Sequence, residues 1–170
     1  MRSLLNSSSK KVITSAIKTE GYHAKWYQEL ANRFGPFDPS VSCLFEALAE
    51  EDEKNKQELI KLAYTVDNSG VLKAGESEFK EPHIIYSEDS YKHFFVVNEK
   101  MALAILNAAL KSEREAQHFY ERCFFTEDHP LLRELYKRLS IFEEHHAQVL
   151  EESMERFHTD SDLRILRSLA

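Results

Sequence analysis

Apolar side chains recur along four stretches of the chain at spacings of three, four and seven residues, the period of a helix that buries one face. Four long helices are therefore predicted, at about 9–34, 39–66, 98–125 and 130–157. In the last of these, Leu139, Phe142 and Leu150 are expected to face inward. The pattern as a whole predicts an all-α fold.

Turn and capping residues separate these helices. Gly35 and Pro36 end the first, Asp38 is expected to cap the second and Asn98 the third, and Pro130 opens the fourth. The 170 residues include only four glycines and four prolines. So few turn residues favour long helices with few connections over an all-β domain.

The segment 67–97 breaks the helical pattern and contains Gly70, Gly75 and Pro82. A connection of this length is unusual inside a compact domain, and a long crossover between the second and third helices of a bundle supplies a reason for it. An excursion without that role is the alternative. After the fourth helix, Thr159 or Asp160 is expected to start a short amphipathic helix within 160–170, which covers the end of the bundle or contacts a second copy.

Composition narrows the class of protein. A hydrophobic content of 42% suffices for one domain over residues 1–170. The net charge of −7 disfavours nucleic-acid and anionic-membrane partners. Cys43 and Cys123 stand far apart, so a disulfide framework and a thiolate metal site are unsupported. No apolar run is long enough for a signal peptide or a membrane span, so a soluble cytoplasmic protein is expected.

Four ionisable residues interrupt the apolar faces in phase with them: Glu20 in the first helix, Glu113 in the third, and Glu143 with His146 in the fourth. Residues three apart share a helix face, so Glu143 and His146 point the same way. Buried carboxylates would repel one another, and cations between them would remove that cost. Carboxylates with imidazole suit iron or manganese. For any one of these residues, the alternative to metal binding is that it lies near the surface, or that a tyrosine or arginine side chain pairs with it.

The two halves of the chain resemble each other around these residues. Tyr27 follows Glu20 by seven residues, and Tyr120 follows Glu113 by the same interval. A duplicated helical hairpin with its polar residues at one level is therefore indicated. Both tyrosines are expected in the core, where they can hydrogen-bond a ligand carboxylate.

The order and spacing of these motifs resemble the ferritin-like di-iron proteins, and within them the rubrerythrin-like branch. The segments that carry the resemblance are 20–31, 45–53, 113–120 and 139–146. In that family the first and third helices each supply a Glu, and the second and fourth each supply Glu-x-x-His. The resemblance therefore implies a ferritin-like four-helix bundle with metal ligands at Glu20, Glu113, Glu143 and His146.

The second helix departs from the family pattern. One alignment puts Asp52 and Asn55 at the Glu and His positions, and the alternative puts Glu53 and Lys56 there. We therefore predict Asp52 as the fifth metal ligand, next to the four named above. The site is accordingly expected to hold two metal ions, or one if the second helix does not ligate.

Other polar residues near these motifs are expected outside the site. His23 and His118 each follow a Glu by three residues but lie off the apolar stripe, and His145 is expected to face outward. Glu50 and Glu51 belong to a charge run and are expected to be solvated.

The resemblance implies oxidoreductase activity on peroxide or dioxygen, with iron as the cofactor and manganese or zinc as alternatives. The chain lacks the cysteines of a rubredoxin domain, so a separate electron donor is expected, and the tail suggests a homodimer. One alternative is a helical bundle with a degraded metal site that acts as a binding or structural module. Iron oxidation with transient storage is a third interpretation.

Overall fold

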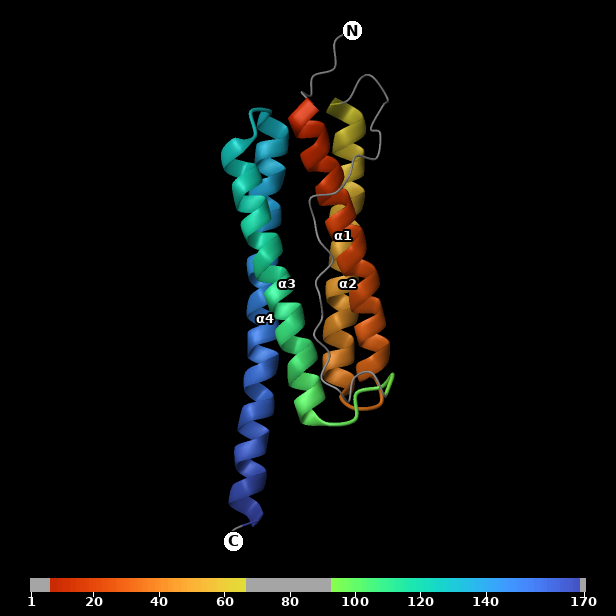
Figure 1. Cartoon of the computed structure of the whole chain (residues 1–170), viewed down its shortest axis with the longest axis vertical. Coiled ribbons are helices and arrows are strands. Elements are labelled where there is room, and N and C mark those ends of the chain that lie inside the picture. Colours follow the sequence, from red (N-terminus) through yellow and green to blue (C-terminus); the bar gives the residue numbers. More distant parts are fainter. Residues whose placement is uncertain (1–6, 67–92, 169–170) are drawn as a thin grey trace.

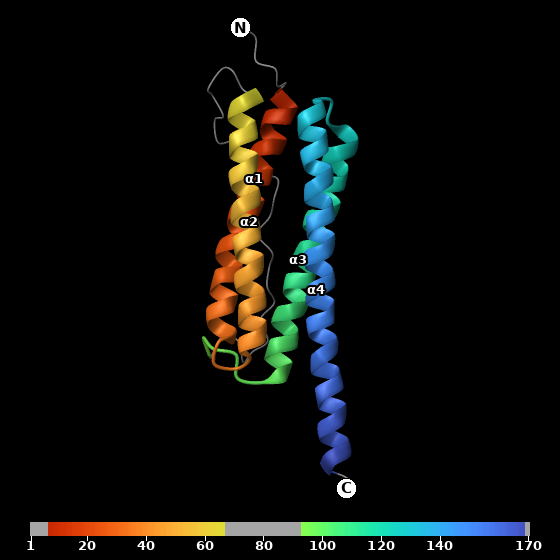
Figure 2. The same ribbon diagram turned by 180° about the vertical axis from the view of Figure 1, so that it is seen from behind.

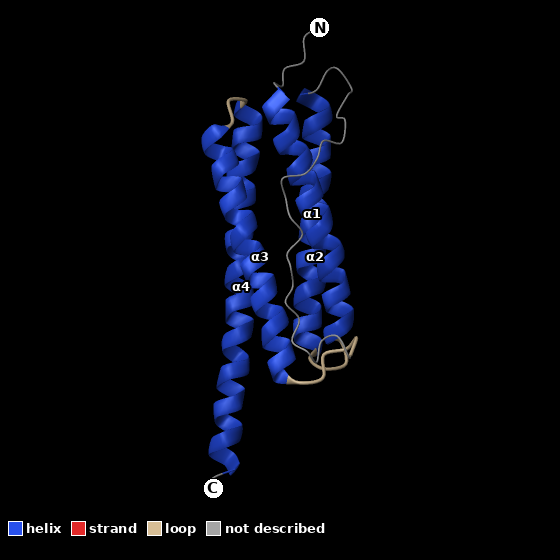
Figure 3. Cartoon of the chain, viewed as in Figure 1, coloured by secondary structure: helices blue, strands red, loops and turns tan. Residues whose placement is uncertain are grey.

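The computed structural model describes residues 7–66 and 93–168 of the chain. It contains four helices: α1 Ser7–Phe34, α2 Pro39–Val66, α3 Glu99–Thr126 and α4 Pro130–Ser168 (Figure 1). The described residues contain no strand (Figure 3). The prediction of an all-α fold with four long helices is confirmed, and α1, α2 and α3 begin and end close to the predicted positions.

The fourth helix differs from its prediction. It continues without a break to Ser168, so a helix ending near 157 and followed by a separate short helix was wrong. Residues 158–168 contain neither glycine nor proline, and the other residue types lower helix stability too little to end a helix. The last part of α4 extends past the ends of the other three helices (Figures 1 and 2). None of the helices that the structure describes is long and apolar enough to cross a membrane.

Both predicted caps are present. The side chain of Asn98 accepts a hydrogen bond of 2.8 Å from the backbone N–H of Met101. At the start of α2, Asp38 Oδ1 accepts from the backbone N–H of Ser40 at 3.0 Å and of Val41 at 3.2 Å. These bonds satisfy N–H groups that a helix leaves unpaired at its first turn.

The four helices form two antiparallel hairpins, α1 with α2 and α3 with α4, which lie side by side (Figures 1 and 2). The end of α2 and the start of α3 lie at opposite ends of the bundle (Figure 1). Most of the predicted crossover, residues 67–92, lies outside the described residues. Its last part docks on α1: Arg33 Nε donates to the Phe94 carbonyl at 2.8 Å, and Val96 N donates to the Arg33 carbonyl at 3.0 Å.

The core consists of two apolar clusters. The first, near the α1–α2 turn, includes Leu30, Phe34, Phe45, Ile105 and Leu150. The second, near the α3–α4 turn, includes Ile13, Leu59, Leu132, Tyr136 and Leu139. On each helix, one pair of buried polar residues lies between the members of these two clusters: Glu20 and His23, Asp52 and Asn55, Ser112 and Glu113, and Glu143 and His146.

The inward face of α4 is only partly as predicted. Leu139 and Leu150 are buried, as expected, whereas Phe142 is 40% exposed. The inward position belongs to its neighbour Glu143, which is fully buried. Consecutive residues are about 100° apart around a helix, so Phe142 turns outward when Glu143 points in.

Candidate metal centre

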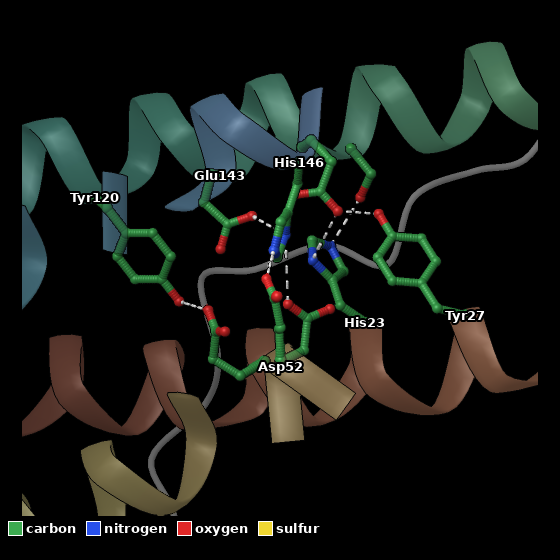
Figure 4. Close-up of polar contacts among 10 residues, drawn as sticks. His23, Tyr27, Asp52, Tyr120, Glu143 and His146 are labelled. Atoms are coloured by element: carbon green, nitrogen blue, oxygen red, sulfur yellow. Dashed lines mark hydrogen bonds and ion pairs between the residues drawn. The ribbon is translucent and has the colours of Figure 1, made fainter. Parts of the chain in front are cut away.

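Six ionisable side chains meet between the two apolar clusters. All four helices contribute, and each of the six is 0% exposed: Glu20 and His23 from α1, Asp52 from α2, Glu113 from α3, and Glu143 and His146 from α4. Figure 4 shows four of them, His23, Asp52, Glu143 and His146, pointing toward one another across the interior of the bundle. The structure therefore brings together all five residues predicted as metal ligands.

His146 directs Nδ1 at three carboxylates. This atom lies 3.6 Å from Asp52 Oδ1, 3.6 Å from Glu113 Oε2 and 3.8 Å from Glu143 Oε2. Two ligand atoms that each bind one cation at about 2.1 Å lie roughly 3.0–4.2 Å apart. The spacing around Nδ1 therefore matches that of ligands around a single ion.

Three groups of side chains have ligand atoms within 4.8 Å of one another: Asp52 with Glu113 and His146, His23 with Glu113 and Glu143, and Glu20 with Asp52 and Glu143. Asp52, Glu113 and Glu143 each belong to two of these groups. A carboxylate has two oxygens, so a shared residue can contact two cations at once. The arrangement could thus hold more than one ion.

Several buried atoms at this site have no hydrogen-bond partner among the residues described: both oxygens of Asp52, both oxygens of Glu143, and Nδ1 of His146. A buried polar atom without a partner costs free energy. A divalent cation would satisfy these atoms together, since all of them are metal-ligand atoms. The donor set therefore fits a bound cation.

Two tyrosines connect the hairpins at this level. Tyr27 on α1 donates a hydrogen bond to Glu113 on α3, and Tyr120 on α3 donates to Glu20 on α1. Both rings are fully buried, and they lie on opposite sides of the cluster (Figure 4). The predicted tyrosine–carboxylate bonds are confirmed, and they hold one oxygen of each glutamate in place.

Burial and mutual repulsion keep most of these acids protonated when no cation is bound. Burial, followed by the negative charges of Glu113 and Glu20, raises the pKa of Asp52 and of Glu143 well above the ordinary range. Burial also raises the pKa of Glu20 to about 7, although the bond from Tyr120 acts in the opposite direction.

Glu113 is the exception and carries the negative charge. Burial opposes its ionisation, but contacts with Glu143, His146 and His23 outweigh that effect and lower its pKa to about 2. Burial likewise disfavours the charged form of His146, yet Glu113, Asp52 and Glu51 raise its pKa to about 10. A proton therefore sits on His146 where a cation would bind.

The structure resolves which residues of α2 face the site. Asp52 is 0% exposed and Asn55 is 8% exposed, so this pair points inward. Glu53 and Lys56 lie on the surface, where their side chains are 48% and 26% exposed and form an ion pair of 2.8 Å. The alternative alignment, with Glu53 and Lys56 as ligand positions, was wrong.

Sequence reasoning missed two participants. His23 was expected off the apolar face, but it is fully buried, with Nδ1 3.8 Å from Glu113 Oε1 and Nε2 2.8 Å from Ser112 Oγ. Glu51 is 47% exposed, yet its carboxylate accepts a 2.9 Å hydrogen bond from His146 Nε2. The spacing of Glu20 and His23, the same as that of Glu143 and His146, was the available signal for His23.

The remaining histidines near the motifs behave as predicted. His118 is 64% exposed and lies 3.2 Å from Glu121 on the same helix. His145 is also exposed, on the outer side of α4. Neither joins the buried cluster.

No family model and no curated protein matches the sequence. Among solved structures, the chain is similar to a hypothetical protein from Pyrococcus furiosus, with a TM-score of 0.71 and 17% sequence identity over 88% of this chain and 90% of that chain. At this identity the likeness concerns the fold alone. Over residues 7–66 and 93–168 the protein is thus all-α with four helices, and their core contains buried acidic and histidine side chains that could hold a metal ion.

Proposed function

We propose that the chain is a ferritin-like protein of the rubrerythrin-like kind, which binds two metal ions and acts as an oxidoreductase on peroxide or dioxygen. The observation that carries the proposal is the convergence of four fully buried carboxylates with His146 from four helices. Such a cluster is costly without cations and favourable with them. Iron is the first candidate, with manganese or zinc as alternatives.

Iron or manganese, when bound, would supply one-electron redox chemistry and an open coordination position for the oxidant. The protein's own residues have distinct parts in this proposal. Asp52 and Glu143 would give up protons and supply ligand oxygens, while Glu113 would offer a carboxylate that is already charged. Tyr27 and Tyr120 hold Glu113 and Glu20 in position. The apolar clusters on both sides limit access of water to the site.

Electrons would come from outside the described helices. The chain has only two cysteines and no C-x-x-C pair, so the proposal requires a separate electron-donor protein or a small reductant. Self-association as a homodimer is part of the same proposal. Exposed apolar side chains on α4, Ile141 at 55% and Phe142 at 40%, offer a surface for it.

A second candidate is a helical bundle that has lost its metal chemistry and acts as a binding or structural module. Asn55 favours this candidate, because it stands where the family pattern has a histidine. Metal content distinguishes the two.

The test compares metal content in three proteins purified without chelator: wild type, Glu113→Ala/His146→Ala, and the control Glu115→Ala/His118→Ala. The control likewise replaces a Glu and a His three residues apart, but both lie on the surface of α3, where their side chains are 56% and 64% exposed. We expect about two ions per chain in wild type and control, and none in the first variant. If wild-type protein holds no metal even after anaerobic reconstitution with ferrous iron, the proposal fails and the module interpretation is favoured.

A further inference from the structure

The three possible ligand groups differ in chemistry. Two of them contain Glu113 together with an imidazole, either His146 or His23. The third, formed by Glu20, Asp52 and Glu143, contains only carboxylates. The site is therefore divided into a nitrogen-containing position beside Glu113 and an all-oxygen position beside Glu20.

The nitrogen-containing position has an imidazole on each side of Glu113. His146 Nδ1 lies 3.6 Å from Glu113 Oε2, and His23 Nδ1 lies 3.8 Å from Glu113 Oε1. The Nε2 atom of each ring faces away, toward Glu51 at 2.9 Å and Ser112 at 2.8 Å respectively. On His146, the hydrogen bond from Nε2–H to the Glu51 carboxylate directs the lone pair of Nδ1 toward the metal position.

The ligand group of the all-oxygen position, Glu20 with Asp52 and Glu143, contains no imidazole. On α2, the residue one turn after Asp52 is Asn55, which lies near Glu20 and favours its charged form. Asn55 is 8% exposed, and its side chain is an amide that has no ring nitrogen to ligate a metal. His118 on α3 and His145 on α4 are exposed and lie outside the cluster.

Metals respond differently to these two donor sets. Imidazole suits iron and the later transition metals, and it favours Fe²⁺ over Mn²⁺. Sites made of carboxylate, carbonyl and water suit Mn²⁺ and the still harder cations Mg²⁺ and Ca²⁺. We infer that the chain binds two unlike cations, an iron ion beside Glu113 and a harder divalent cation, represented by Mn²⁺, beside Glu20. This inference rests on the proposed function, because it requires that the cluster bind metal.

The test is a competition between two metals. Metal-free protein is mixed anaerobically with an excess of Fe(II) and Mn(II) in equal amounts, desalted, and analysed for both metals. We expect about one iron and about one manganese per chain, and a manganese paramagnetic resonance signal altered by the neighbouring iron. Two irons or two manganese ions per chain would overturn the inference and leave the proposed function intact. Retention of neither metal would contradict the proposed function itself.

A variant at Asn55 tests which residue sets the different metal preferences of the two positions. Asn55→His adds an imidazole to the all-oxygen position, so the manganese content should fall several-fold while iron rises toward about two per chain. Asn107→His, which adds an imidazole at an exposed position of α3, is the matched control and should leave both contents unchanged. If Asn55→His has the helical circular dichroism of the wild type and retains its manganese, the inference is wrong.

His23→Gln examines the other position. Loss of one ring nitrogen beside Glu113 should lower iron retention and leave manganese retention unchanged. Loss of manganese with iron retained would mean that His23 belongs to the manganese position, and this would contradict the inferred division into two positions.

Discussion

Among single residues, Glu51 shows how a side chain at the surface can control a buried one. Its carboxylate is 47% exposed and accepts the Nε2–H of His146, whose other ring nitrogen faces Asp52 and Glu113. The bond sets both the orientation of the ring and the nitrogen that remains available to a metal. Glu51 is therefore a positioning residue.

Glu51→Ala should weaken metal binding about 10- to 100-fold, the usual effect of removing such a partner. Glu51→Gln should weaken binding less, because its amide oxygen still accepts a hydrogen bond. Competition with a chelator measures the affinity, and Glu50→Ala, which changes a neighbouring side chain that is 76% exposed, is the control. Equal affinities for Glu51→Ala and wild type would exclude this role.

The sequence predicted Glu20, Glu113, Glu143 and His146 at the site because each lies in phase with an apolar stripe. Asp52 was predicted from the alignment of the second helix with the family pattern. His23 was missed since the stripe of α1 alone does not show how far the other hairpin covers its edge. The choice between Asp52 and Glu53 stayed open for a similar reason. Adjacent residues are about 100° apart on a helix, and only the packing of α2 decides which of them is covered.

Among the elements, α2 has an N-terminus with a defined cap. Asp38 accepts hydrogen bonds from the backbone of Ser40 and Val41, and Arg156 of α4 lies 3.4 Å from its carboxylate. Burial by itself would raise the pKa of Asp38, but these hydrogen bonds and the charge of Arg156 lower it. The cap is therefore charged, and its contribution is lost only as the pH falls through this lowered pKa.

Asp38→Ala should reduce the free energy of unfolding by about 1 kcal/mol, within the range of roughly 0.5–2 kcal/mol known for helix caps. Asp38→Asn should reduce it less, because asparagine also caps helices well. Urea denaturation followed by circular dichroism at 222 nm measures the difference. A loss as large for Asp38→Asn as for Asp38→Ala would mean that the charge, and not the cap, stabilises α2.

Helix starts were easier to predict than the end of α4. Asp38 and Asn98 have side chains that accept hydrogen bonds from the first turn of a helix, so a helix start can be predicted from the residue type alone. The boundary placed near 157 relied on Thr159 and Asp160, which can cap a helix but also occur within one. Without a glycine or proline between 158 and 168, nothing in the backbone forces the helix to end.

For the whole molecule, the metal-free protein should become less stable as the pH rises. His146, Asp52 and Glu143 have pKa values above those of the unfolded chain, so they contribute stability that is lost as they deprotonate. Burial lowers the pKa of His23, so this residue makes the protein more stable as the pH rises. That effect is confined to pH values below its ordinary pKa of about 6.5.

We therefore expect the urea midpoint of metal-free protein to fall between about pH 7 and about pH 9. Excess ferrous or manganous ion, added anaerobically, should raise it again, because a ligand that binds only the folded state stabilises that state. Asp52→Asn, which removes one ionisable group, should show a smaller dependence on pH. A midpoint that is constant or rises with pH would contradict the charge arrangement of the site.

Two hairpins with complementary faces were predictable from the repeated motifs, and the path between them was not. The crossover prediction depends on residues 67–97, of which only the last few are described, although α2 ends and α3 begins at opposite ends of the bundle. A segment rich in charge with few apolar residues has too weak a pattern to indicate its own path.

The polar layer between the two apolar clusters also acts on the alignment of the hairpins. A slide of one hairpin along the other by a single turn, about 5.4 Å, would press carboxylates against leucine and phenylalanine and break both tyrosine bonds. Apolar faces alone discriminate poorly against such slips, because their side chains can substitute for one another. Buried polar groups are known to select one register at some expense of stability. The residues that could hold a metal thus also select one register of the two hairpins, with or without a bound ion.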